Sequence, residues 1–315
     1  MCVGDVVIDI TAKVPALPER GGDVLAESGG VLPGGTGFNV MVAATRLGLH
    51  SAYGGAHGTG PFGDIARAAL LREGIEILQA PVPEVDTGWD VALTDAGSER
   101  TFITSVGAEA RLTDERIADI RVSEDDIVYV SGYGLLGEPN RSAITGWLAT
   151  LPAAATVVTD PGPLVGDIPR DVLLAVQART TWWSCNLVEA LAGTGATTAA
   201  DAAVRLAAAR MDTAGMGAVG MGVIVRSGAD GCLLLAPGGG DPVHLPGHPV
   251  DAVDSNGAGD AHVGAFIAGI ASGLPPVAAA QRANAAAAVA VTRNGPATGP
   301  TTAELDLFLT ARPSP

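Results

Sequence analysis

The sequence predicts an α/β fold in which a doubly wound, mostly parallel sheet carries helices on both faces. One observation is that strand-like and helix-like segments alternate after Arg111 at the spacing of βαβ units. Another is an earlier β-hairpin pattern, which does not belong in a parallel sheet. The composition agrees, since 47% hydrophobic and 17% charged residues suffice for a large core. We therefore expect residues 1–315 to form a single domain with a small additional sheet.

The alternating segments are short apolar runs separated by helical patterns. The predicted strands are 126–131, 156–160, 181–186 and 222–226, and the predicted helices between and after them are 140–151, 170–179, 188–191 and 198–211. Two further runs, 232–236 and 242–246, are expected to be antiparallel strands. A last long helix is predicted over 276–292.

The hairpin lies in the first third of the chain. Residues 89–94 and 100–104 alternate apolar and polar side chains around a turn containing Asp95 and Gly97. Segments within about 10–33 and 86–106 are expected to form the small sheet. Because such a sheet would stand beside the ligand crevice, we expect it to act as a lid.

The N-terminal run 3–10 is predicted to be a buried strand, although it contains Asp5 and Asp9. A buried carboxylate is costly unless it is paired or lies at a functional edge. Asp9 is near the carboxyl end of the strand, where open α/β sheets bind ligands. It is therefore a candidate ligand-binding residue, and the alternative is an acid at a solvent edge that starts a turn.

Glycines precede two predicted helices. Residues 34–37 lead into a helix over 40–47, and Asn39 either caps that helix or binds a polyol. Residues 254–260 lead into a helix that includes 261–269. There, free N–H groups and the helix dipole favour a phosphate, and Asp260 could accept a hydroxyl proton. The alternative is an ordinary helix start with a favourable acidic residue in its first turn.

Charge and cysteine content exclude several classes of function. The formal charge is −16 and Lys13 is the sole lysine, which argues against binding to nucleic acid or anionic membranes. No P-loop lysine motif occurs, so a phosphate site would depend on backbone N–H groups and Mg²⁺. Three scattered cysteines, the lack of a signal-peptide pattern and the lack of a long apolar run favour a cytoplasmic protein.

Four motifs occur in a fixed order and together span most of the chain. They are Gly34-Gly35-Thr36-Gly37-Phe38-Asn39 with the helix ending at Arg46-Leu47-Gly48, then Asn186-Leu187-Val188-Glu189, then Ser227-Gly228-Ala229-Asp230-Gly231, and last Asp254-Ser255-Asn256-Gly257-Ala258-Gly259-Asp260. In this combination the chain resembles the PfkB, or ribokinase-like, family of ATP-dependent sugar and nucleoside kinases. The resemblance implies a ribokinase-like fold with a small β-sheet lid over the sugar site.

The resemblance also implies a role for each motif. Asp260 is similar to the catalytic base, which takes the proton of a sugar primary hydroxyl as that oxygen attacks the γ-phosphate of ATP. The implied anion hole is Gly257, Ala258 and Gly259, and the implied hydroxyl ligands of the substrate are Asp9, Gly35 and Asn39. Arg100, in the hairpin, could reach the substrate as well.

Nucleotide and ion roles follow from the same resemblance. Asn186 and Glu189 match residues that organise Mg²⁺ and its waters, with Glu189 acting through water. The implied nucleotide side comprises Ser227, Gly228 and Gly231, with Asn284 near the adenine. Asp254 and Asn256 match positions around a potassium ion, so K⁺ is a further ion to test.

Some residues depart from the family pattern. Arg226 stands where the family usually has Thr, and Ser255 and Asn256 replace two Thr. Val7 replaces an Asn that ribokinases usually carry two residues before the substrate Asp. Asp160-Pro161-Gly162-Pro163 lacks the Arg that would bind a sugar-acid carboxylate. Arg226 puts the nucleotide contact in question, and Ser255 and Asn256 do the same for the cation site. Val7 weakens ribose specifically, and the missing Arg lowers the expectation of an acidic sugar.

The favoured interpretation is a kinase of a pentose or ketohexose, and the sequence leaves the sugar open. A nucleoside kinase is the alternative, with Trp89, Phe102 and Tyr133 as candidate walls for a base. A catalytically silent nucleotide-binding homologue is the third, although the base and anion hole are both intact. Apolar residues on the hairpin would be exposed at an edge, which predicts a homodimer through the lid.

Overall fold

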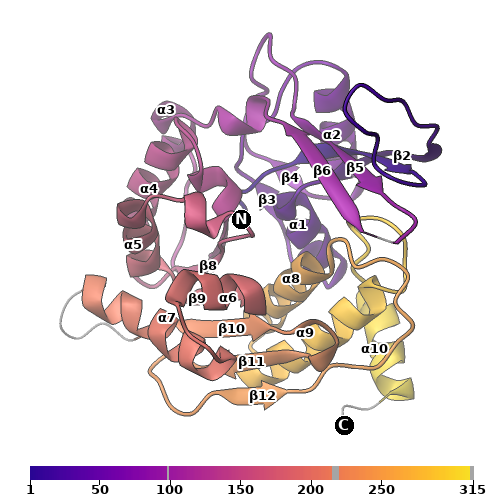
Figure 1. Ribbon diagram of the computed structural model, residues 1–315. Helices are drawn as coiled ribbons and strands as arrows, with labels where there is room; N and C mark the ends of the chain where they lie inside the picture. Colours follow the sequence, from indigo (N-terminus) through magenta and orange to yellow (C-terminus); the bar gives the residue numbers. More distant parts are fainter. Residues whose placement is uncertain (98, 215–219, 313–315) are drawn as a thin grey trace.

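The computed structural model describes residues 1–97, 99–214 and 220–312, and the side chains of 28, 100 and 210–214 lie outside that description. Within this part, a six-stranded sheet has the order β12-β11-β10-β9-β8-β7 (Figure 1). Its parallel strands are β7 (Ile127–Ser131), β8 (Thr156–Asp160), β9 (Trp182–Asn186) and β10 (Gly222–Arg226). The antiparallel strands β11 (Cys232–Leu235) and β12 (Val243–Leu245) complete it.

The sheet is extended by a short parallel pair, β3 (Ala52–Tyr53) and β4 (Glu76–Ile77). Cys2 joins this pair to β7 through parallel bridges to Tyr53 and Tyr129. The predicted strand over 3–10 is therefore wrong in its placement, because the chain leaves this sheet near Gly4 and pairs elsewhere from Val7 onward. An apolar run that is buried in both sheets carries no sign of where it crosses from one to the other.

Alternating residues of the strands pack into hydrophobic cores on opposite faces of the sheet. Tyr129, Val158, Trp182 and Ile224 belong to one core, and their neighbours in the strands belong to the cores on the other face. The first face is covered by α1 (Thr36–Arg46), α2 (Pro61–Arg72), α8 (Ala258–Ala271), α9 (Pro276–Ala290) and α10 (Thr302–Ala311). The second is covered by α3 (Asp114–Ala118), α4 (Asn140–Thr150), α5 (Arg170–Arg179), α6 (Leu187–Thr194) and α7 (Ala199–Ala214).

Four 3₁₀ turns connect described elements: η1 (Ala108–Ala110), η2 (Gly132–Leu135), η3 (Val165–Asp167) and η4 (Gly228–Asp230). No described helix is both long enough and apolar enough to cross a membrane.

A second sheet of four strands stands apart, with the order β2-β1-β5-β6, at the upper right of Figure 1. Its strands are β1 (Val7–Lys13), β2 (Glu27–Gly34), β5 (Trp89–Thr94) and β6 (Arg100–Ser105). The predicted hairpin is β5 and β6, and β1 runs parallel to β5 so that Asp9 lies opposite Asp90. The predicted α/β architecture with a separate small sheet is confirmed.

Helix α8 is the best-anchored element on the first face. Its Phe266 packs edge-on against Trp182 of β9, with ring centroids 4.9 Å apart. Its Gly264 lies so close to α1 that an added Cβ would be 2.4 Å from the carbonyl oxygen of Val40. Because small residues let α1 and α8 approach backbone to backbone, the start of α8 is fixed relative to the start of α1.

We expect Phe266→Ala to lower the free energy of unfolding by about 3–5 kcal/mol, because it leaves a cavity beside Trp182. Leu307 is 71% exposed in α10, so Leu307→Ala is the control and should change stability by about 0.5 kcal/mol or less. Urea titration of both variants measures the difference. Equal losses would contradict the anchoring role of Phe266.

Candidate active site

Each of the four adjacent parallel strands ends in a polar residue. Ser131, Asp160, Asn186 and Arg226 are the last residues of β7, β8, β9 and β10. Carboxyl ends of parallel strands meet at one edge of the sheet, where open α/β folds bind ligands. The start of α8 reaches the same edge, since Arg226 donates to the carbonyl oxygen of Gly259.

The first turn of α6 places Asn186 and Glu189. Asn186 Oδ1 accepts from the N–H of Glu189 at 2.8 Å, while the Glu189 carboxylate accepts from the N–H and Nδ2 of Asn186, both at 2.8 Å. This is a reciprocal capping box, which holds the two side chains in one geometry. Burial and the nearby charge of Asp160 raise the pKa of Glu189. The predicted pair is thus brought to the carboxyl edge of the sheet, fixed in orientation.

The loop before α8 is tied to the segment after α9. The carboxylate of Asp254 accepts from the N–H of Asn256 at 2.8 Å and from the N–H of Gly295 at 3.0 Å. Gly257 has a φ of 71°, and a Cβ there would lie 1.8 Å from the carbonyl oxygen of Pro296. Only glycine fits both conditions, so the loop conformation depends on this residue.

The first turn of α8 presents unused donors. No hydrogen bond among the described residues uses the N–H of Gly259 or of Asp260, and no side chain caps this helix at Gly257. Such N–H groups point away from the helix start and favour an anion. Of the predicted anion hole, Gly259 keeps an N–H that is unpaired within the described part of the chain, whereas the N–H of Ala258 donates to the carbonyl oxygen of Ser255 at 3.3 Å. The N–H of Asp260 is a further donor that the sequence does not predict.

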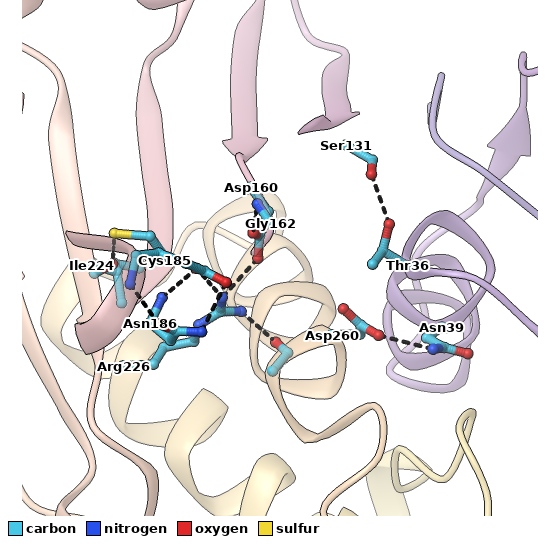
Figure 2. A network of polar contacts seen from close by, with 12 residues as sticks. Thr36, Asn39, Ser131, Asp160, Gly162, Cys185, Asn186, Ile224, Arg226 and Asp260 are labelled. Atoms are coloured by element: carbon cyan, nitrogen blue, oxygen red, sulfur yellow. Dashed lines mark hydrogen bonds and ion pairs between the residues drawn. The ribbon is translucent and has the colours of Figure 1, made fainter. Parts of the chain in front are cut away.

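Asp260 is held by α1. Asn39 Nδ2 donates to Asp260 Oδ2 at 2.8 Å, and Figure 2 shows the two side chains meeting between α8 and α1. Burial raises the pKa of Asp260 to about 7, while the bond from Asn39 and the charge of Arg226 oppose that rise. Asn39 Oδ1 is buried and has no hydrogen-bond partner among the described residues. The pair therefore offers a proton acceptor and a polar atom that still needs a partner.

Arg226 lies among acidic groups (Figure 2). Its Nη2 is 2.8 Å from Asp160 Oδ2 and 3.9 Å from Glu189 Oε2, and its Nη1 donates to the carbonyl oxygen of Gly259 at 2.9 Å. The side chains of Arg226 and Asp160 are only 12% and 8% exposed. In the sequence, Arg226 is visible only as a departure from the family pattern. Its contacts with Asp160 and Gly259 could not be predicted, because no local pattern shows which acid a distant arginine meets.

A carboxylate pair lies in the four-stranded sheet. Asp9, 5% exposed, faces Asp90 across β1 and β5, and Gly34 makes room for it, because a Cβ there would be 2.3 Å from Asp9 Oδ1. Burial, and then the charge of Asp90, raise the pKa of Asp9 to about 7. Asp90 Oδ1 has no hydrogen-bond partner among the described residues. Asp90 was not predicted, and its only signal was an acid within an apolar strand.

Asp5 is the second acid of the N-terminal run. Its carboxylate accepts from the N–H of Thr36 at 3.1 Å and from the Thr36 hydroxyl at 2.7 Å. The Thr36 hydroxyl also contacts Ser131 Oγ at 2.7 Å. A Cβ on Gly35 would lie 2.8 Å from Asp5 Oδ2. Asp5 therefore caps α1 and explains why glycine precedes that helix.

The other predicted residues lie in the turn after β10, in α9, and at the start of β6. Ser227, Gly228 and Gly231 form the turn directly after β10, closed by a bond from the N–H of Ser227 to the carbonyl oxygen of Gly231 at 2.8 Å. Asn284 is buried, donates to the carbonyl oxygens of Leu245 and Pro246, and meets His262 through Oδ1. It supports the 245–247 segment, and a direct adenine contact would require these bonds to break. Arg100 begins β6, and its side chain is not described.

The match to known families is extensive. Residues 1–303 match the family model described as pfkB family carbohydrate kinase. The chain belongs to the pfkB family of carbohydrate kinases. The uncharacterized sugar kinase YegV of Escherichia coli K12 is 33% identical over 305 residues, which cover 97% of this chain and 92% of that protein. An ATP-dependent ribose-1-phosphate kinase of Halopiger xanaduensis is 29% identical, covering 99% and 98%.

Solved structures agree with this pfkB assignment. A putative ribokinase II of Escherichia coli in complex with ATP and Mg²⁺ superposes with a TM-score of 0.81 at 25% identity, covering 99% of this chain and 98% of that one. Ribokinase of Thermotoga maritima gives a TM-score of 0.81 at 24% identity, covering 98% of each chain. The predicted ribokinase-like fold is therefore confirmed.

The residues of this pfkB kinase fit a phosphate group better than a bare metal ion. The unused N–H groups of Gly259 and Asp260 suit phosphoryl oxygens. Among the described residues, no cluster of three or more His, Cys, Asp or Glu side chains could hold a metal ion. That agrees with Mg²⁺ chemistry in phosphoryl transfer, where the ion is bound by one or two carboxylates together with phosphates and waters.

We expect Asp90→Asn to stabilise the pfkB kinase at pH 8 by on the order of 1 kcal/mol. Folded Asp9 has a pKa of about 7, above its ordinary value of 3.8, so the native state binds more protons than the unfolded state between those pH values. Stability therefore falls as pH rises from about 4 to 7, and removing the charge of Asp90 reduces that fall.

Thermal unfolding of wild type and variant from pH 4.5 to 8 measures this effect. Glu124→Gln removes an exposed charge and serves as the control, with no pH-dependent difference. An Asp90→Asn difference that stays constant across the pH range would contradict repulsion between the two carboxylates.

Proposed function

We propose that this kinase transfers the γ-phosphoryl group of ATP to a primary hydroxyl of a small, uncharged sugar. The observation that supports this most directly is the position of Asp260 in the first turn of α8, next to unused N–H groups and held by Asn39. A base and an anion site on consecutive residues suit a reaction in which a hydroxyl attacks a phosphoryl group.

In this mechanism the sugar oxygen forms a bond to the γ-phosphorus while the bond from that phosphorus to the bridging oxygen of ATP breaks, leaving ADP. Asp260 takes the hydroxyl proton, and its pKa of about 7 suits proton exchange near neutral pH. The N–H groups of Gly259 and Asp260, with Gly257 and Ala258 shaping the loop, hold the charge on the transferring oxygens.

Nucleotide and ion binding follow the predicted roles. Ser227, Gly228 and Gly231 would line the nucleotide side, next to the phosphates. Asn186 and Glu189 would hold Mg²⁺ through water, and the bound ion would neutralise phosphate charge. The loop containing Asp254 and Asn256 is proposed for K⁺, which an assay with and without K⁺ tests.

The acceptor site is acidic, which supports a neutral sugar. Asp9, Asp90 and Asp260 face this side, and Asp260 already adds to the repulsion felt by Asp9. A phosphorylated or carboxylated sugar would meet like charges there. Relatives named fructokinase, such as that of Vibrio alginolyticus at 28% identity over 97% of this chain, support a neutral acceptor, whereas the Halopiger relative is named for a phosphorylated one.

A nucleoside is the second candidate acceptor. An aminoimidazole riboside kinase from Salmonella enterica, solved with its riboside and an ATP analogue, superposes with a TM-score of 0.77 at 25% identity. Tyr133, 39% exposed just after β7, could stack on a base. A screen of ADP release over pentoses, fructose, ketodeoxygluconate and nucleosides separates the two acceptors.

We expect Asp260→Asn to reduce turnover at least about 100-fold, because the hydroxyl proton loses its acceptor. ATP binding, measured by calorimetry, should persist, since the N–H groups remain. Glu115→Gln, which changes a fully exposed acid, is the control and should leave turnover unchanged. Near-wild-type phosphorylation by Asp260→Asn would refute the assignment of the base, and turnover on no acceptor by wild type would refute the function itself.

We also propose a cytoplasmic homodimer that pairs through the four-stranded sheet. Val31 of β2 and Ile103 of β6 lie in one cross-strand row with Ile10 and Val91, so they share a face of the sheet. They are 49% and 58% exposed, an apolar surface that a partner would cover. The three cysteines are unpaired, which suits a reducing compartment.

We expect light scattering at micromolar concentration to give twice the 31.4 kDa chain mass. Ile103→Lys should shift the protein toward monomer, because it buries a charge in the interface. Lys13 lies in the same sheet but is exposed and already charged, so Lys13→Gln is the control. A wild-type monomer would overturn the dimer.

A further inference from the structure

We propose that Arg226 is a positioning residue of the phosphoryl-transfer site, which orients the Gly259–Asp260 peptide toward the transferring group. Because this role acts on the same chemistry, it rests on the function proposed above. The geometry that points to it is a single guanidinium that joins β8, β10 and the first turn of α8.

The guanidinium uses two arms of one planar fork. Nη2 pairs with Asp160 Oδ2 at 2.8 Å, and Nη1 donates to the carbonyl oxygen of Gly259 at 2.9 Å. Asp160 is itself fixed, since its Oδ1 accepts from the N–H of Gly162 at 3.0 Å. A rigid fork held at one end by an anchored carboxylate defines the direction in which the other end can donate.

The bond to Gly259 acts on the neighbouring N–H. The carbonyl of Gly259 and the N–H of Asp260 belong to the same planar trans peptide, so they point in opposite directions. Fixing the oxygen on the side of Arg226 therefore aims the N–H of Asp260 away from Arg226. A hydrogen bond from a cation to the oxygen also polarises the peptide, which strengthens that N–H as a donor.

Glycine at position 259 leaves room for this contact. A Cβ there would lie 3.0 Å from Nη1 and 3.3 Å from Cζ of Arg226, so the guanidinium would have to shift to accommodate it. Arg226 also brings a fixed positive charge beside a cluster of acids, opposing the rise that burial causes in the pKa of Asp260. The buried charge of Arg226 and the fixed orientation of the Gly259–Asp260 peptide both suit a phosphoryl-transfer site, and packing alone needs neither of them.

The experiment compares Arg226→Met, Arg226→Lys and the double variant Asp160→Asn/Arg226→Met. Arg226→Met leaves the Asp160 carboxylate buried without its cation, so its melting temperature should fall. The double variant removes both charges and should recover most of that loss. A purely structural Arg226 predicts that turnover recovers together with stability.

We expect kcat to stay about 10- to 100-fold below wild type in the double variant, with KM for the sugar changed less than about threefold. Arg226→Lys keeps the charge without the fork, so it should melt close to wild type and lose kcat about 10-fold. Recovery of kcat in the double variant would overturn the proposal, and so would full activity of Arg226→Lys. If the double variant does not fold, the activity of Arg226→Lys decides between the two roles.

Hydrogen–deuterium exchange provides a readout without substrate. The peptide covering residues 254–262 should exchange faster in the double variant than in wild type, because the first turn of α8 loses its tether. Unchanged exchange would overturn the tethering. If wild type phosphorylates no acceptor while this difference is present, the proposed function fails and the positioning of the α8 start stands.

Discussion

The site depends on the contact between the glycine-rich loop before α8 and the backbone after α9. Gly257 approaches the carbonyl oxygen of Pro296 so closely that no side chain fits, and Asp254 ties the same loop to Gly295. This contact sets where α8 begins. The start of α8 in turn sets the direction of the free N–H groups and the position of Asp260.

Acidic side chains outnumber basic ones around the start of α8. Asp160, Glu189 and Asp260 surround the buried cation of Arg226, while Asp9 and Asp90 repel each other in the four-stranded sheet. Carboxylates with raised pKa values lower stability near neutral pH and are typical of functional sites. The hydrophobic cores on both faces of the six-stranded sheet offset that cost.

Much of this could be predicted from the sequence, because local patterns determine it. Strand β8 and helix α5 begin and end where the periodicity indicated, and the loop motif at 254–260 leads into a helix, as predicted. Features that depend on distant pairing could not be predicted. The pairing of Arg226 with Asp160, and of Asp9 with Asp90, joins residues 66 and 81 positions apart, and β1 pairs with β2 and β5 in the four-stranded sheet. No period along the chain encodes such partners.

The separation of the two sheets has a consequence for how this family can diversify. Three glycines of the α8 region, at 257, 259 and 264, each meet backbone atoms or a guanidinium, so a side chain at any of them would force α8 or its neighbours to shift. Asp9 and Asp90 lie on the other sheet, where neighbouring side chains can change without moving α8. Substitutions in the four-stranded sheet can therefore change the surroundings of Asp9 and Asp90 while the start of α8 keeps its geometry.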